Sequence, residues 1–503
     1  MQLIKQKRCG KIKGRTCADG RKQRQYINQE DSTPPTVSTE ALLITLMVDA
    51  LENRDVATSD VPGAFLHSDM DEDVTVIVDG ALVELLVQSN NKYAKFVHIC
   101  RDGKKVVFLK LDKALYGTVR AARLFWENLS GTLREYGFET NPYDACVMNM
   151  NIEGKQCTIV WHVDDLKISH VDESVINDII TKLESNYGKM SMTVGKRHTY
   201  VGMNIQYNDS GTVTIDMVDY VKECLAEFPE TLEKEVKTPA ASNLFEVRDE
   251  IPLLDPSLAK LFHRIVAKLL FVCKRARPDI QVPIAFLSTR TTKSNEDDWR
   301  KLRRLMRYLQ FTSNLVLTLK AEDLTVIKWW VDASYAVHDN MRSHTGATMT
   351  LGGGALYSKS SKQKLNTKSS TEAELVAASD MVGQILWTKE FLANQGYQVK
   401  RNILYQDNKS AILLEKNGSL SSSQKTRHIN VRYFFIKDKV DQGDIEIVYC
   451  PTGDMLADFF TKPLQGNQFI AFRERILGLS YAKIQEGVAG PVNTRTVIKA
   501  SEF

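Results

Sequence analysis

The chain has 503 residues, of which 43% are hydrophobic and 25% are charged. At roughly 150 residues per domain, this length predicts about three domains. The composition excludes collagen-like, low-complexity and wholly disordered proteins, and the net charge of +4 indicates no partner by itself.

The spacing of the cysteines and the length of the apolar runs indicate the compartment in which we expect the protein. The eight cysteines form no Cys-x-x-Cys pair, which favours reduced thiols in an intracellular protein over a zinc knuckle or a disulfide framework. The N-terminus lacks the apolar run of a signal peptide. No stretch approaches the ~18 apolar residues of a membrane span, so we expect no membrane partner.

The first 25 residues are strongly basic, with nine Lys/Arg, among them Lys13 and Arg15, against the single Asp19. Such a cluster suits a phosphate backbone, because each cation near a phosphate releases a condensed counterion. The alternative is a solvated tail, and charge alone does not decide between them.

In the first half, the pattern predicts a helix over 38–51, with Ala41, Leu42, Leu46 and Val48 among the buried candidates. Two strands are expected at 156–162 and 166–170 around a turn that holds Asp164 and Asp165. An amphipathic helix follows at 174–188. The proline-containing stretch 229–256 is the best candidate boundary.

In the second half, basic amphipathic helices are expected at 261–276 and 297–310. A strand at 325–335, a hairpin around 352–354, a helix at 371–396 and a strand and helix within 402–416 predict a small mixed α/β domain. Trp329 and Trp330 are read as core rather than as a base-stacking platform. Residues from 481 onward are polar and expected to be poorly ordered.

Three acidic residues stand out in the first half, namely Asp60 after a strand-like run and the pair Asp164 and Asp165 at the turn. Carboxylates are the natural ligands of Mg²⁺, and two such ions can stabilise an in-line phosphoryl displacement. The alternative for the pair alone is a solvated turn, because Asp favours turns.

The surroundings of these acids resemble a known family. DVPGAFL (residues 60–66), LDKALYGTVRAARLFWENL (residues 111–129) and WHVDDLKISH (residues 161–170) are similar in order and spacing to motifs of copia-type retrotransposon reverse transcriptases. RCGKIKGRTCADGRKQR (residues 8–24) resembles the basic fingers segment, and RPDI (residues 277–280) and ADFFTKPL (residues 457–464) resemble further signatures. The resemblance covers most of residues 5–466 and points to the reverse transcriptase–ribonuclease H portion of the family's Pol polyprotein.

The resemblance implies an α/β (α+β) chain with polymerase fingers, palm and thumb, in which Asp60, Asp164 and Asp165 hold metal ions. Phe65 falls where the family places an aromatic ring that excludes ribonucleotides by clash, although ordinary core packing is the alternative. The residues expected near nucleotide, template or phosphate are Tyr116, Gly117, Arg120, Lys13 and Arg15. Gly117, which has no side chain, could allow close approach of the backbone to a ligand. The chain departs from the family at Thr118, Val119, Ala122 and His162, changes that bear on nucleotide contacts and leave the metal ligands untouched.

The second half carries Asp332, Glu374, Asp407 and Asp458, a set that resembles the ribonuclease H domain of the same family. Such acids could bind two Mg²⁺ ions for phosphodiester hydrolysis. Glu372 competes with Glu374, since only one of them can face the site; the family pattern favours Glu374. Ser369 is expected within the N-cap run of the helix bearing Glu374. His428 could touch nucleic acid or have a structural role.

The resulting expectation is a reverse transcriptase segment at 1–240 (partial fingers plus palm), a thumb or connection at 241–325, a ribonuclease H-like domain at 326–466 and a tail at 467–503. The resemblance implies two Mg²⁺ ions per site, with Mn²⁺ as an alternative. The implied partners are an RNA template, a DNA primer, deoxynucleoside triphosphates and an RNA–DNA hybrid, in the cytoplasm or nucleus. Two alternatives remain, because Met1 falls inside what resembles the fingers: a truncated remnant that only binds nucleic acid, or ribonuclease H activity alone.

Overall fold

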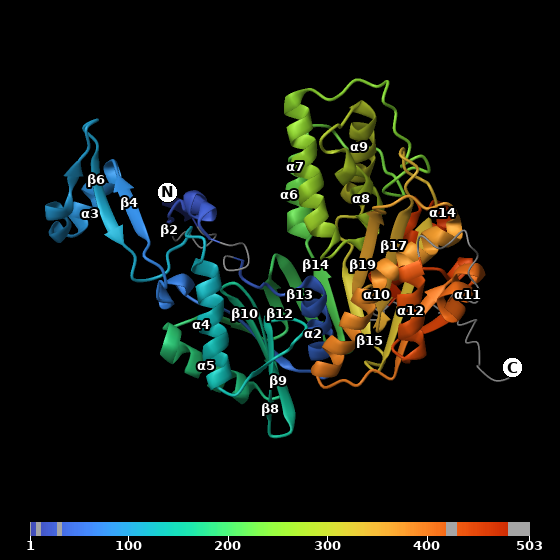
Figure 1. Cartoon of the computed structure of the whole chain (residues 1–503), viewed down its shortest axis with the longest axis horizontal. Coiled ribbons are helices and arrows are strands. Elements are labelled where there is room, and N and C mark those ends of the chain that lie inside the picture. The colour runs from blue at the N-terminus through green and yellow to red at the C-terminus, as the bar shows by residue number, and fades with distance from the viewer. Residues whose placement is uncertain (1, 7–11, 28–32, 419–429, 481–503) are drawn as a thin grey trace. The chain divides into compact units, whose positions relative to one another are not determined.

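The computed structural model describes residues 2–6, 12–27, 33–418 and 430–480, and it divides into two compact units (Figure 1). Unit 1 holds the residues up to 37 and residues 56–193, and unit 2 holds residues 38–55 and the residues from 194 onward. His428 and the residues from 481 onward lie outside the described residues. Within the described ranges, no helix is long and apolar enough to cross a membrane.

Unit 1 is built on a six-stranded sheet with the order β11-β3-β10-β9-β8-β7. Its strands are β3 (Asp55–Asp60), β7 (Glu139–Thr140), β8 (Val147–Ile152), β9 (Lys155–His162), β10 (Asp165–His170) and β11 (Ser191–Val194). Helix α5 (Glu173–Tyr187) packs on β10, and α4 (Ala121–Glu135) meets α5 where the Phe125 and Tyr187 rings lie 6.2 Å apart. The predicted strand pair and the helix after it are confirmed.

The rest of unit 1 consists of smaller elements. The basic N-terminal segment forms the hairpin β1 (Gln2–Gln6) and β2 (Ile12–Thr16), followed by the 3-10 helix η1 (Gly20–Gln25). A three-stranded sheet joins β4 (Thr75–Asp79), β6 (Lys105–Lys110) and β5 (His98–Ile99), with α3 (Ala81–Ser89) beside it. Two further 3-10 helices are η2 (Ala64–His67) and η3 (Asn91–Phe96).

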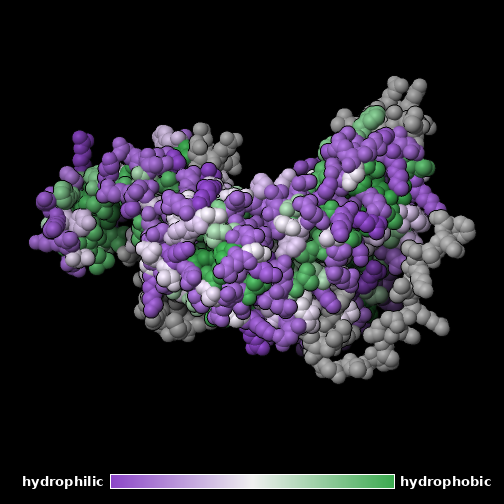
Figure 2. All heavy atoms as spheres, turned by 90° about the horizontal axis from the view of Figure 1, so that it is seen from below, coloured by the Kyte–Doolittle hydropathy of each residue, from purple (hydrophilic) through white to green (hydrophobic). Residues whose placement is uncertain are grey.

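The three-stranded sheet carries hydrophobic side chains on its outer face. Ile77 and Phe108 are opposite each other on β4 and β6, and 61% and 52% of them are exposed. The space-filling view shows hydrophobic surface in this part of the chain among largely hydrophilic residues (Figure 2). The inner face is covered instead, where Val107 is fully buried.

Unit 2 begins with a five-stranded sheet in the order β12-β13-β14-β15-β18. Its strands are β12 (Arg197–Tyr200), β13 (Met203–Asn208), β14 (Thr212–Asp216), β15 (Leu317–Ala321) and β18 (Gly352–Gly353). Helix α2 (Thr39–Leu51), capped by Ser38, packs on β14 and β15. The four residues expected inside this helix, Ala41, Leu42, Leu46 and Val48, are all buried.

Four helices follow, namely α6 (Val218–Ala226), α7 (Pro256–Cys273), α8 (Gln281–Arg290) and α9 (Glu296–Phe311), with the 3-10 helix η4 (Pro278–Ile280) before α8. The predicted loop-rich stretch separates α6 from α7. Arg277, from the RPDI sequence, is buried and donates two 2.8 Å hydrogen bonds to Asp279, which also accepts one from Tyr308. This fully paired buried group joins the start of α8 to α9.

The second sheet of unit 2 has the order β19-β17-β16-β20-β21, in which β20 and β21 are parallel to β16 and the other pairs are antiparallel. Its strands are β16 (Val326–Ser334), β17 (His344–Thr350), β19 (Tyr357–Lys362), β20 (Arg401–Gln406) and β21 (Glu446–Tyr449). This is the mixed α/β arrangement expected for the second half. Trp329 and Trp330 are buried, as the core interpretation predicted.

The long helix α10 (Ser370–Asn394) packs on β16 and β17. It is followed by α11 (Lys409–Asn417), α12 (Asn430–Asp441), the 3-10 helix η7 (Thr452–Asp454), α13 (Asp458–Thr461) and α14 (Gly466–Leu477). As expected, Ser369 is the N-cap of α10, and its hydroxyl accepts a hydrogen bond from the Glu372 N–H at 3.2 Å. The predicted α/β (α+β) fold class is confirmed.

Candidate active sites

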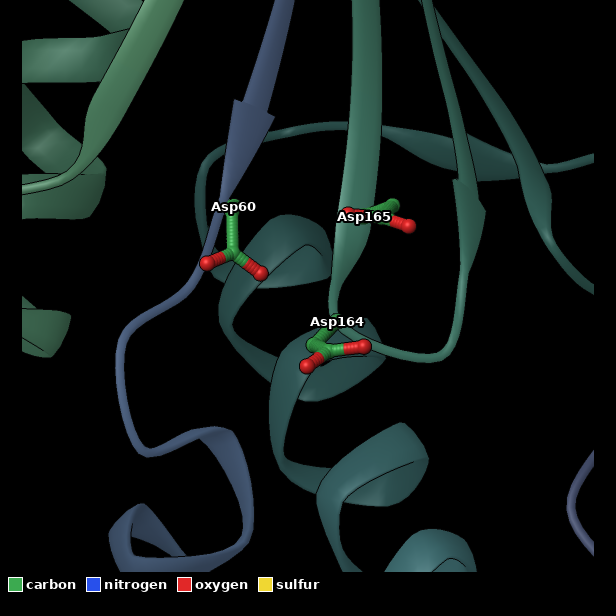
Figure 3. Close-up of side chains that lie close together, drawn as sticks. All are labelled: Asp60, Asp164 and Asp165. Atoms are coloured by element: carbon green, nitrogen blue, oxygen red, sulfur yellow. The ribbon is translucent and has the colours of Figure 1, made fainter. Parts of the chain in front are cut away.

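The first candidate site lies where β3 and β10 end side by side in unit 1. Asp60 is the last residue of β3, Asp164 is in the turn and Asp165 is the first residue of β10 (Figure 3). Each contributes a carboxylate oxygen, and these three atoms lie within 4.8 Å of one another. All three side chains are half-buried. The short distances show that the structure brings together the acids that the sequence singled out.

The turn that presents Asp164 has a constrained backbone. His162 and Asp165 are paired, so Val163 and Asp164 alone connect the two strands. Val163 has a φ of 60°, which is unfavourable for a β-branched residue and costs about 1–3 kcal/mol in typical cases. The N–H of Val61 donates a 3.0 Å hydrogen bond to the Asp164 carbonyl, which fixes the turn against the end of β3.

Phe65 lies in η2, a few residues after Asp60, and its ring centroid is 4.4 Å from that of Tyr116. Both residues are half-buried. Phe65 also packs against the small core of Ala114, Ala121 and Leu124. The structure therefore gives Phe65 a packing partner on one side and leaves part of the ring accessible, which is compatible with either sequence interpretation.

Gly117 contacts its own chain closely. Its φ is +90°, and a Cβ atom there would collide with the carbonyl oxygen of Ala18. The N–H of Ala18 donates a 2.8 Å hydrogen bond to the Tyr116 carbonyl, and the N–H of Val119 donates one of 3.0 Å to Gln23. The close approach expected for a ligand is made here by the basic N-terminal segment, whose contacts with Tyr116, Gly117 and Val119 were not predicted from the sequence.

A cavity of about 740 Å³ lies at this junction in unit 1. It is lined on one side by Arg21 and Arg24 of η1 and on the other by Gly117 and Thr118. Asp19 also lines the cavity and is ion-paired with Arg21 at 2.6 Å, so Arg24 is the cation of this pair that could attract an anionic group without first leaving Asp19.

Arg120 is partly buried and engaged in ion pairs. Its guanidinium lies 2.6 Å from Asp71 and 3.2 Å from Glu72. An arginine held by two acids contacts a phosphate only after those pairs rearrange. Lys13 and Arg15 have their backbone in β2, and their side chains lie outside the described part of the chain.

The second candidate site lies in unit 2 at the centre of its mixed sheet. Asp332 is on the central strand β16, Glu374 is on α10, and Asp407 directly follows β20. One carboxylate oxygen from each lies within 4.8 Å of the others. Asp458, the fourth acid, is the first residue of α13 and lies near Asp332. Burial, and then the charge of Asp332, raise the pKa of Asp458. Asp332, Glu374 and Asp407 thus converge from separate elements, and Asp458 joins them beside Asp332.

Glu374, rather than Glu372, faces this cluster. The Glu372 carboxylate instead accepts a 2.7 Å hydrogen bond from the N–H of Lys368 at the start of α10. Glu374 is buried, and its Oε2 atom accepts no hydrogen bond from any residue in the described ranges.

The electrostatics of the cluster favour a bound cation. Burial, with repulsion from Asp332 and Asp407, raises the pKa of Glu374 well above its usual range. Burial and the charge of Asp332 likewise raise the pKa of Asp458 to about 7. Carboxylates this hard to ionise are stabilised in the charged form by an ion between them.

Three neighbours of the acids were not singled out from the sequence. The buried Thr461 hydroxyl donates a hydrogen bond to Asp332, and Lys462 lies 2.6 Å from Asp458. Thr452 donates a 3.1 Å hydrogen bond to Asp407. The four-residue spacing of Asp458 and Lys462 could have indicated their pairing.

Both acid clusters fit divalent metal ions. Hard cations prefer several oxygen ligands from carboxylates, and the members of both clusters are all Asp or Glu. In the second cluster, the buried Glu374 oxygen provides an additional ligand atom. Among the described residues, His/Cys/Asp/Glu groups close enough to hold a metal are these two clusters.

Comparison with known proteins gives a consistent result. Residues 2–242 match the family model described as reverse transcriptase (RNA-dependent DNA polymerase). The chain is 27% identical over 473 residues to the retrovirus-related Pol polyprotein from transposon TNT 1-94 of Nicotiana tabacum, and 26% identical over 469 residues to that from transposon RE1 of Arabidopsis thaliana. Each alignment covers 93% of this chain, which spans 34% and 30% of those proteins.

A solved structure of the foamy viral protease-reverse transcriptase in complex with double-stranded DNA aligns with 89% of this chain and 64% of that one. Its TM-score is 0.47 and its sequence identity is 12%.

Proposed function

We propose that the chain is an RNA-directed DNA polymerase with ribonuclease H activity, because residues 2–242 match the reverse transcriptase (RNA-dependent DNA polymerase) family model and 93% of the chain is similar to Pol polyproteins of plant transposons. Its substrates would be an RNA template, a DNA primer and deoxynucleoside triphosphates in unit 1, and an RNA–DNA hybrid in unit 2. The observation that carries the proposal is the presence of two converged carboxylate clusters, one in each unit.

In unit 1, Asp60 and Asp164 would hold two Mg²⁺ ions, with Mn²⁺ as an alternative and Asp165 in support. Such ions, when bound, stabilise the attacking and leaving oxygens of phosphoryl transfer. Phe65, held by Tyr116, would exclude a ribose 2′-hydroxyl by clash. Arg24, and Arg21 once it leaves Asp19, would attract the triphosphate or the template backbone to the cavity beside Gly117.

In unit 2, Asp332, Glu374, Asp407 and Asp458 would hold the same type of ions for hydrolysis of the RNA strand. Thr461 and Thr452 orient two of these carboxylates through the hydrogen bonds described above. A rigid set of oriented carboxylates lowers the reorganisation needed when the substrate binds.

The two activities can be tested separately on the full chain. We expect Mg²⁺-dependent extension of a labelled primer on an RNA template, which Asp164→Asn abolishes while hybrid cleavage persists. Asp407→Asn should have the opposite effect, so each variant is the folding control for the other. Nucleic-acid binding without extension by the unmodified protein would contradict the polymerase proposal, and cleavage that persists in Asp407→Asn would contradict the ribonuclease proposal.

A further inference from the structure

Lys462 is a cation placed among the acids of the unit 2 site. Its Nζ atom lies 2.6 Å from Oδ1 of Asp458 and 3.7 Å from Oδ2 of Asp332. Both carboxylates are almost fully buried, whereas 40% of the Lys462 side chain is exposed. In the described part of the chain, Lys462 is the cation that pairs with this cluster.

The position of this ammonium group has an electrostatic reason. Buried carboxylates at short range repel one another strongly, because little water screens them. An ammonium between Asp458 and Asp332 offsets part of that repulsion. Lys462 directly follows α13, which begins with Asp458, so the cation and its partner are carried by one short segment.

The same position conflicts with a metal ion bound to Asp458. A Mg²⁺ ligand oxygen lies about 2.0–2.1 Å from the ion. An ion on the Asp458 oxygen that now faces Lys462 would place two cations side by side. The ammonium therefore has to move when that ion binds.

Lys462 has the means to move. Its side chain is long, flexible and partly exposed. It lines a cavity of about 510 Å³ together with Ser334, His338 and Thr461, so there is space next to its present position. Thr461 has no such freedom, because it is fully buried and bonded to Asp332.

We propose that Lys462 is a positioning residue that takes the place of one metal ion while the ribonuclease H site is metal-free, and that this ion binds by displacing it. This inference rests on the proposed ribonuclease function of unit 2. It has two consequences: Lys462 stabilises the metal-free cluster, and it weakens the affinity of the site for the ion.

The test measures metal binding instead of activity. The full chain with Asp60→Asn, Asp164→Asn and Asp165→Asn, which removes the carboxylates of the other site, is titrated with Mn²⁺ while free Mn²⁺ is followed by electron paramagnetic resonance. Adding Lys462→Met should tighten Mn²⁺ binding by roughly 3- to 10-fold. The same variant should unfold at a lower temperature in EDTA. Lys462→Gln is a second neutral variant if the first folds poorly.

Two controls separate charge from structure. Lys462→Arg keeps a cation and should bind Mn²⁺ nearly as the parent does. Lys389→Met removes a similarly paired lysine, 2.6 Å from Asp444, outside the acid cluster of the same unit, and should leave Mn²⁺ affinity unchanged. A merely structural role of Lys462 would give weaker binding on its removal, not tighter binding.

The outcomes distinguish this inference from the function beneath it. If the parent binds Mn²⁺ in a way that Asp407→Asn removes, but Lys462→Met binds equally or more weakly, the Lys462 proposal is overturned and the ribonuclease site stands. If the parent shows no such Mn²⁺ binding, the ribonuclease proposal fails, and the Lys462 proposal fails with it.

Discussion

Whether a glycine can be replaced depends on the atoms around it, as Gly117 shows. The sequence suggested a glycine that lets a ligand approach, and the structure shows the Ala18 backbone in that position. Gly131, in the middle of α4, has no atom within 4 Å of the place where a Cβ would be. The same residue type is therefore required at one position and replaceable at the other.

We expect Gly117→Ala to destabilise unit 1 by at least about 1–2 kcal/mol, because alanine at positive φ is strained and its Cβ would push Ala18 away. Primer extension should fall with it, since η1 would lose its position beside Tyr116. Gly131→Ala is the matched control and should gain about 0.5–1 kcal/mol. Thermal unfolding and primer extension measure both effects; equal melting temperatures for the two variants would contradict the prediction.

Glu374 gives a prediction about pH. Its folded-state pKa is raised well above the ordinary 4.5, mainly by burial and then by Asp332 and Asp407. In the metal-free protein, the unfolded chain ionises this group first as pH rises, so its contribution to stability is present below pH 4.5 and is lost as the pH rises toward the folded-state value.

Glu374→Gln removes this dependence. In EDTA, the melting temperature of the variant minus that of the unmodified chain should therefore be more positive at pH 8 than at pH 5. Differential scanning calorimetry gives this difference. Glu372→Gln, which keeps an acceptor for the Lys368 N–H and lies away from the cluster, should show similar differences at both pH values. An equal melting-temperature difference at pH 5 and pH 8 for Glu374→Gln would contradict the prediction, because it would show that ionisation of Glu374 does not destabilise the folded state.

Among the secondary-structure elements, the contact of α13 with β17 sets the geometry of the unit 2 site. Gly346 on β17 is paired with Asp332 on β16. A Cβ at Gly346 would lie 2.8 Å from the Ala457 carbonyl oxygen and 2.5 Å from a Thr461 side-chain carbon. The absence of a side chain on β17 thus allows the segment that carries Asp458 to lie flat on the sheet next to Asp332.

Gly346→Ala should therefore displace α13, at a cost of about 1–3 kcal/mol, and separate Asp458 from Asp332. The rate of hybrid cleavage should fall about 10-fold or more, because a displacement of the Asp458 carboxylate by about 1 Å can have this effect. Primer extension should persist. Gly383→Ala on α10 is the control, since nothing lies within 4 Å of its Cβ position. Loss of both activities in Gly346→Ala would indicate general unfolding.

At the scale of the whole molecule, the segment predicted as a separate ribonuclease H domain is joined to the helices before it. The Ser358 carbonyl on β19 accepts hydrogen bonds of 3.0 Å from Lys274 and 3.1 Å from Gln281. Helix α8 packs against β19 and α13, and β18 pairs with β15. The predicted boundary at 325 cuts through these contacts.

A fragment of residues 326–480 should therefore unfold at a lower temperature and less cooperatively than the full chain. A fragment of residues 256–480 keeps α7, α8 and α9 and should recover part of that stability. Circular dichroism melts and amide hydrogen exchange across β16 and β20 would measure the difference. Equal protection in the shorter fragment and the full chain would instead support the boundary at 325.

Several helices and strands and the acids of both sites could be predicted from the sequence alone. Hydrophobic periodicity is local, so it located α5, α10 and the β9–β10 pair, and motif order identified Asp60, Asp164 and Asp165 together. The N-cap at Ser369 could also be predicted from the sequence, because its hydrogen bond joins residues only three positions apart.

Which side chains contact one another depends on the long-range packing of the chain. The family pattern favoured Glu374 over Glu372, but periodicity could not, because the choice depends on how α10 is rotated against β16. The pairs of Arg120 with Asp71 and Glu72 cross some fifty positions of sequence. The place of Lys462 between Asp458 and Asp332 requires α13 to lie on β17. Such contacts come from strand order and long-range packing, which local periodicity does not encode.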